Sequence, residues 1–99
     1  MPEADVFRAI ADPTRRAVLE LLRGGDRSVS EVMEPFRISQ PAVSQHLRVL
    51  REAGLVRVRN VGRERRYALD PRPLRAVDRW LRRLVIDPAG HVLRIQKEE

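Results

Sequence analysis

Apolar residues recur at helical intervals near the start of the chain and predict two short helices. The first covers about residues 4–11, and the second follows Asp12 and Pro13, an N-cap residue and a proline that are typical of a helix start. Gly24 and Gly25 come at its end, where glycine commonly stops a helix.

Two cap sequences predict two further helices. Ser28 and Glu31 stand three residues apart, the spacing of a capping box, and they open a short helix. After a tight connection, Ser39 caps a longer helix over about residues 40–53, which Gly54 ends. Two helices joined by a tight turn are typical of a helix-turn-helix.

After Gly54 the apolar period changes from that of a helix to that of a strand. Residues 55–69 alternate in polarity around a turn, and they predict a β-hairpin. Asp70 and Pro71 then open a last helix over about residues 72–86, with apolar residues at heptad-like spacing. The expected fold is mainly α with one small β-hairpin, in the order α-α-α-α-β-β-α. It is a winged helix-turn-helix formed as a single domain over residues 1–99.

The longer helix, residues 40–53, has two different faces. Val43, Leu47 and Leu50 form an apolar stripe, and no acidic residue precedes Glu52 on the other side. That other side carries Gln40, Pro41, Ser44, Gln45, Arg48 and Arg51. Amides, hydroxyls and arginines reach base edges in the major groove, so the pattern favours a recognition helix. The alternative is an ordinary polar surface that happens to lack acids.

The hairpin is rich in arginine. Arg57, Arg59, Arg63, Arg65 and Arg66 fall within ten residues, against a single acid. Alternation places the first two on one face, and Arg63 at the tip is positioned to enter a minor groove or bind a phosphate. The alternative is a charged edge that protects the hairpin from aggregation.

Composition agrees with a nucleic-acid ligand but does not decide the question. The 99 residues carry a net charge of +6, and Lys97 is the only lysine. Arginine suits phosphates and guanine edges, although an arginine-rich proteome would give the same balance. Cysteine is absent, which excludes disulfides and thiolate sites. With no signal-peptide pattern and no apolar run near the ~20 residues of a membrane span, we expect a cytoplasmic location and no membrane partner.

Two other functional classes were weighed. An enzyme is not expected, because the only histidines, His46 and His91, lack a recognisable nucleophile or base arrangement. His46 lies beside the apolar stripe, where a structural or phosphate-facing role is favoured. A winged-helix module that binds another protein through its last helix remains open, and a steep salt dependence of duplex affinity would exclude it.

Three stretches of the sequence resemble a known family. They are DPTRR at 12–16, ISQPAVSQHL at 38–47 and LREAGLV at 50–56. Together they resemble the arsenic-repressor (ArsR) family of winged-helix regulators, over about residues 4–80. The resemblance implies a homodimer built on the first and last helices. It also implies repression from a double-stranded DNA operator with two half-sites in adjacent major grooves.

The expected sites follow from these patterns. The DNA-binding residues are Ser39, Gln40, Pro41, Ser44, Gln45, His46, Arg48, Arg63 and Arg65. The dimer interface comprises the apolar faces of the first and last helices, namely Val6, Phe7, Ile10, Leu74, Val77, Trp80, Leu81 and Leu84.

The sequence departs from the metal sensors of that family. Their cysteine pair is replaced by a stretch between Glu31 and Glu34. Asp78 and His91 match two positions of the zinc-type site, but Trp80 and Arg94 replace the other ligands. Two ligands of four cannot close a zinc site, so we expect no metal and no cofactor. The sequence leaves open whether an unknown small molecule, a protein inducer or neither controls the protein.

Overall fold

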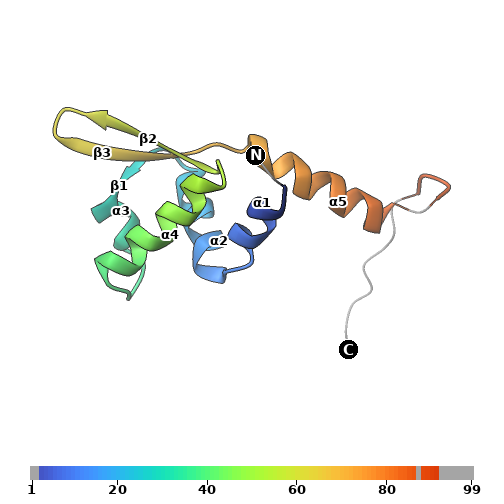
Figure 1. Cartoon of the computed structure of the whole chain (residues 1–99), viewed down its shortest axis with the longest axis horizontal. Helices are drawn as coiled ribbons and strands as arrows, with labels where there is room; N and C mark the ends of the chain where they lie inside the picture. Colours follow the sequence, from blue (N-terminus) through green and yellow to red (C-terminus); the bar gives the residue numbers. More distant parts are fainter. Residues whose placement is uncertain (1–2, 87, 92–99) are drawn as a thin grey trace.

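The computed structural model describes residues 3–86 and 88–91 (Figure 1). In chain order, the elements are α1 (Glu3–Ile10), α2 (Pro13–Leu22), β1 (Arg27–Ser28), α3 (Val29–Met33), α4 (Gln40–Glu52), β2 (Val56–Val61), β3 (Glu64–Leu69), the 3₁₀ turn η1 (Arg72–Leu74) and α5 (Arg75–Val85). The expected fold class is confirmed. α1, α2 and α4 pack together, while the β2–β3 hairpin projects from one end of this body and α5 from the other.

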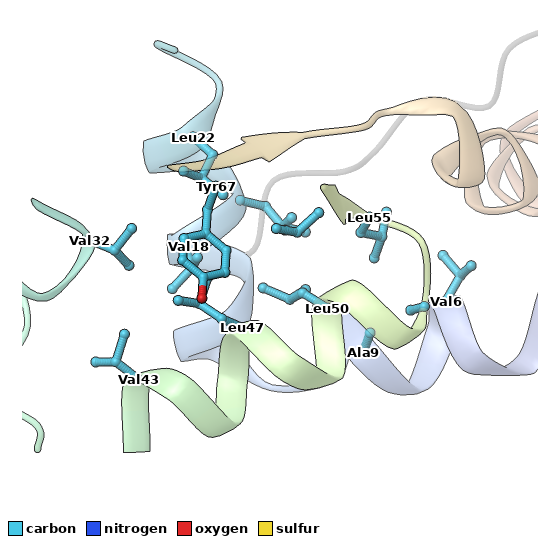
Figure 2. Close-up of a cluster of buried hydrophobic side chains, with 13 residues drawn as sticks. Val6, Ala9, Val18, Leu22, Val32, Val43, Leu47, Leu50, Leu55 and Tyr67 are labelled. Atoms are coloured by element: carbon cyan, nitrogen blue, oxygen red, sulfur yellow. The ribbon is translucent and has the colours of Figure 1, made fainter. Parts of the chain in front are cut away.

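The core gathers residues from nearly every element. Leu47 and Leu50 of α4 are 1% and 0% exposed, and they pack with Val18 of α2 and with Leu55, which precedes β2 (Figure 2). Tyr67 brings β3 into the same cluster. Full burial of each such aliphatic side chain contributes about 1.5–3 kcal/mol, so this cluster sets the orientation of α4.

The junction of α1 and α2 explains the DPTRR stretch. Asp12 Oδ2 accepts a hydrogen bond from the Arg15 N–H at 2.9 Å and caps α2. Arg15 Nε donates to the Ala9 carbonyl at 2.6 Å, and Arg16 Nη1 donates to the Ile10 carbonyl at 2.8 Å. The two arginines therefore satisfy the last carbonyls of α1, which have no partner inside the helix. This stretch joins two helices at a fixed angle.

The structure corrects two sequence predictions about the sheet and the last helix. The predicted hairpin is part of a three-stranded sheet of order β1-β3-β2, because Arg27 and Ser28 pair with Tyr67 and Arg66. A two-residue strand has no period that a sequence could show.

The last helix starts later than residue 72. Residues 72–74 form η1, closed by the Leu74 N–H to the Pro71 carbonyl at 3.0 Å, and Asp70 caps this turn, because its Oδ1 accepts the Arg72 N–H at 3.1 Å. α5 ends at Val85, near the predicted break at residues 87–90. Asp87 and the predicted frayed end, residues 97–99, lie outside the described residues.

Candidate nucleic-acid interface

The helix before the recognition helix, α3, is fixed by the predicted capping box. Ser28 Oγ accepts a hydrogen bond from the Glu31 N–H at 3.2 Å, and the Ser28 N–H donates to Glu31 Oε1 at 3.1 Å. The Ser28 hydrogen bonds are also the main reason that the pKa of the Glu31 carboxyl is lowered. Val32 lies fully buried, and α3 packs against α4. The capping box therefore sets where α3 begins.

α4 has the two faces that the sequence predicts. Ser39 Oγ accepts the Ala42 N–H at 3.3 Å and caps the helix, while Val43, Leu47 and Leu50 are buried. The opposite face is exposed and consists of Gln40, Pro41, Ser44, Gln45, Arg48 and Arg51. Its uncharged first turns lie at the positive end of the helix dipole.

Arg48 has one partner on this face. Its Nε donates to Glu52 Oε1 at 3.1 Å, and both side chains are about two-thirds exposed or more. An exposed pair four residues apart on a helix contributes only about 0.3–0.5 kcal/mol. Arg48 is therefore available for another anion.

His46 faces a different environment from its neighbours on α4. Its side chain is 20% exposed, and Nδ1 lies 3.4 Å from Arg15 Nη1 and 3.9 Å from Asp12 Oδ2. The Arg15 N–H bond is the main reason that the pKa of Asp12 is lowered, and His46 is a further cause. His46 thus joins α4 to the α1–α2 junction, and its expected contact with DNA stays a prediction.

The wing, which we define as β2, β3 and the turn between them, is a regular hairpin. Val61 pairs with Glu64 across a two-residue turn made of Gly62 and Arg63. Gly62 has φ +63°, as the first central residue of a type II′ turn requires. The turn lies at the end of the wing farthest from the helical body (Figure 1), and Arg63 is one of its two residues.

The structure divides the five wing arginines into two groups by their partners. Three of them pair with carboxylates at the base of the wing. Arg57 Nε donates to Asp70 Oδ2 at 2.9 Å, and Arg59 Nη2 donates to Asp26 Oδ2 at 3.1 Å. Arg66 binds Asp26 as well. These contacts support the charged-edge alternative for this group alone.

Arg63 and Arg65 form the second group. Within residues 3–86 and 88–91, Arg63 has no polar partner, and Arg65 contacts only the ring of Tyr67, with its guanidinium carbon 5.9 Å from the ring centroid. Both side chains are exposed. The wing tip therefore presents two cations whose charge is not neutralised by the protein.

Two acidic residues of this region were missed by the sequence analysis. Asp26 precedes β1, and Asp70 follows β3, where it was expected only as a helix cap. Asp26 lies 33 residues before Arg59 and 40 before Arg66 in the sequence, so no local spacing relates them.

The expected dimer face is only partly available at the surface. Trp80, Leu81 and Leu84 of α5 are 42%, 44% and 54% exposed. Phe7 packs edge-on against Trp80, with centroids 5.6 Å apart at 85°. Val6, by contrast, is 3% exposed and belongs to the core. Ile10, Leu74 and Val77 are half-buried against that core.

Residues 3–86 and 88–91 offer neither a cluster of metal ligands nor a membrane-spanning helix. They contain no group of three or more histidine or acidic side chains placed to hold a metal ion. Asp78, one of the two zinc-type positions, accepts from Arg82 Nε at 3.1 Å. Arg94 lies outside the described residues. No described helix has the length and apolar character needed to cross a membrane.

Comparison with known proteins identifies the family. A model of bacterial regulatory proteins of the arsR family matches residues 12–58. The transcriptional repressor SdpR of Bacillus subtilis (strain 168) is 39% identical over 77 residues, which cover 78% of this chain and 86% of SdpR. The chain belongs to the arsR family. The resemblance drawn from residues 12–16, 38–47 and 50–56 is thereby confirmed.

Further relatives of the arsR chain agree in fold and class. The HTH-type transcriptional regulator Rv2034 of Mycobacterium tuberculosis (strain H37Rv) is 48% identical over 71 residues, which cover 72% of this chain and 66% of that protein. A crystal structure of an ArsR family transcriptional regulator superposes with a TM-score of 0.74 at 40% identity, covering 82% of this chain and 84% of the other. All three are regulators of transcription. The matched segment, residues 12–58, runs from the cap of α2 to the middle of β2.

Proposed function

We propose that this arsR-family regulator is a homodimeric repressor that binds an inverted-repeat operator, with α4 contacting base edges and the wing tip contacting phosphates. The observation that carries the proposal is the contrast between the uncharged first turns of α4 and the two unpaired arginines of the wing. Amides and hydroxyls discriminate bases through directed hydrogen bonds, whereas a cation binds any phosphate.

On α4, the proposal assigns base contacts to Gln40, Ser44 and Gln45, which are exposed on the first two turns. Ser39 and Pro41 lie at the positive end of the helix and are assigned to the backbone of the DNA. Arg48 is assigned a phosphate because its pairing with Glu52 is weak. His46 is assigned a supporting place at the edge of this contact, since Arg15 and Asp12 already hold its ring.

The dimer is proposed from the outer face of α5. Trp80, Leu81 and Leu84 expose a continuous apolar surface on a helix that projects from the core. Pairing with a second α5, with Phe7 of α1 at the edge, would bury this surface. A twofold dimer places its two recognition helices about 34 Å apart, which is one turn of DNA.

Control of the repressor is proposed to be independent of metal ions. The two zinc-type positions lack their partner ligands in the sequence, and Asp78 pairs with Arg82. If zinc or arsenite at a near-stoichiometric level weakened operator binding by about tenfold, or about 1.4 kcal/mol, this part would be wrong. If metal ions leave operator binding unchanged, a small molecule or a protein partner is the class of inducer to seek.

The proposal is tested by selection of bound duplexes from random DNA with the purified full chain. We expect an enriched inverted repeat with half-site centres about 10 base pairs apart, and an affinity that falls steeply with salt. Sedimentation at micromolar concentration should show a dimer. Failure to enrich any duplex, with a salt-independent affinity for other proteins, would favour the protein-binding module instead.

A further inference from the structure

The base of the wing contains a network of charges that the function of the wing tip does not explain. Arg66 of β3, 24% exposed at its side chain, lies at its centre. Its Nη1 donates to Glu31 Oε1 at 3.0 Å and to the Glu64 carboxylate. Its Nη2 donates to the Asp26 carbonyl at 3.0 Å and to Asp26 Oδ1 at 3.3 Å. One guanidinium therefore joins three separate segments.

Asp26 offsets the repulsion between two arginines on neighbouring strands. Arg59 and Arg66 are direct partners in the β2–β3 register, and like charges placed opposite each other destabilise a hairpin. Asp26 lies between them, with Oδ1 bound to Arg66 and Oδ2 bound to Arg59. The favourable arrangement of the two arginines thus depends on a residue outside the hairpin.

Glu31 links this network to the helix-turn-helix. The same oxygen, Oε1, accepts the Ser28 N–H of the capping box and Nη1 of Arg66. Ser28 itself belongs to β1, which pairs with β3. The residue that sets the start of α3 therefore also holds the wing, and α3 in turn packs against the recognition helix.

We propose that Arg66, held by Asp26 and Glu31, is a positioning residue that fixes the wing tip relative to the recognition helix and does not itself bind DNA. The inference rests on the proposed function, because it concerns how Arg63 and Arg65 reach phosphates while α4 lies in the groove. The opposite hypothesis is that Arg66 leaves its carboxylates and binds a phosphate directly.

The two hypotheses predict opposite signs for Asp26→Asn. This change removes a negative charge, so electrostatics alone predicts tighter binding to DNA. If the wing must be anchored, binding instead weakens, and we expect a loss of about tenfold on the selected operator, equivalent to about 1.4 kcal/mol. Glu20→Gln is the matched control: it removes the same charge from an exposed residue of α2 that has no polar partner among the described residues.

A variant without the wing-tip arginines shows whether the loss of operator affinity depends on them. In the full-length Arg63→Ala/Arg65→Ala protein, Asp26→Asn should lower operator affinity by less than about twofold, because non-additivity is expected only between coupled residues. Arg66→Lys keeps the charge but cannot span the three carboxylates, so it should also weaken operator binding in the intact background.

The measurement is fluorescence anisotropy of the selected operator at several salt concentrations, with thermal melting to confirm that each variant is folded. Three results would overturn the proposal: Asp26→Asn binding as tightly as Glu20→Gln, an equal loss in both backgrounds, or Arg66→Lys binding like the unmodified chain. Should Asp26→Asn not fold, the Arg66→Lys comparison decides. Failure of the unmodified chain to bind its selected duplex would refute the proposed function instead.

Discussion

The helix α4 and the wing differ in how their exposed side chains are supported. On the side of α4 opposite its polar face, Val43, Leu47 and Leu50 are each 0–1% exposed. Packing in the core therefore sets the position of the helix. The wing extends beyond the core and is held at its base by ion pairs of Arg59 and Arg66. Packed interiors resist small displacements, whereas partly exposed ion pairs are weak and sensitive to salt.

This difference matches the two tasks proposed for them. Hydrogen bonds to base edges require side chains placed within a narrow range of distance and angle, which a core-supported helix provides. A phosphate contact tolerates more movement, and long arginine side chains at a hairpin tip are suited to it. Mutations in α4 and in the wing should therefore have different effects on stability, sequence preference and the salt dependence of binding.

The largest expected effect is on stability. Leu47→Ala removes a buried side chain from beneath the recognition helix and should lower the free energy of unfolding by about 2–5 kcal/mol. Val61→Ala in the wing, where the side chain is 50% exposed, should change it by less than about 0.5 kcal/mol. Urea denaturation measures both. Equal losses would mean that the wing belongs to the same packed unit as α4.

The next effect concerns sequence preference. Gln45→Ala should weaken binding to the selected operator by about 1–3 kcal/mol and leave random duplex nearly unchanged, because the amide contacts base edges. Anisotropy on both duplexes at one salt concentration measures the difference. Exposed Glu20→Gln, on α2, is the control outside the proposed contact. If Gln45→Ala lowers both affinities equally, α4 is not the element that selects the sequence.

The sequence predicts the core-supported helix α4 better than it predicts the ion pairs at the base of the wing. The period of Val43, Leu47 and Leu50 predicts α4 and its exposed face, because burial on one side of a helix repeats along the chain. Ser28 and Glu31 predict their own cap for the same local reason. The partners of Arg59 and Arg66 are brought together only by folding, so the sequence did not show that these two arginines pair with Asp26. Val6 likewise has the spacing of an interface residue but lies in the core.

A smaller effect is expected at the wing tip. Arg63→Ala should weaken operator and random duplex by similar factors, and it should flatten the plot of log affinity against log salt by about one unit. Arg23→Ala is the matched control, since it removes the same charge from an exposed position next to α2 that has no part in the proposed DNA or dimer contacts. A change of sequence preference in Arg63→Ala alone would reverse the assignments of helix and wing.

The smallest effect is a dependence of stability on pH that arises at the base of the wing. The hydrogen bond from Arg59 is the main reason that the pKa of Asp26 lies below its ordinary value of 3.8, and the Ser28 N–H does the same for Glu31, whose ordinary value is 4.5. Because both values are lowered by folding, these carboxylates stabilise the protein above their ordinary pKa. That contribution is lost as the pH falls through the lower, folded-state pKa.

Asp26→Asn removes one of the two groups, so the unmodified chain should lose more stability than this variant between neutral pH and about pH 3. Urea denaturation at both pH values measures the difference, with Glu20→Gln as the control for a carboxylate that has no partner among the described residues. The core-supported α4 depends much less on these charges, so Leu47→Ala should cost the same at either pH. If Asp26→Asn and the unmodified chain lose equal stability on acidification, the base of the wing is not held by this carboxylate, and the contrast between the two regions would rest on packing alone.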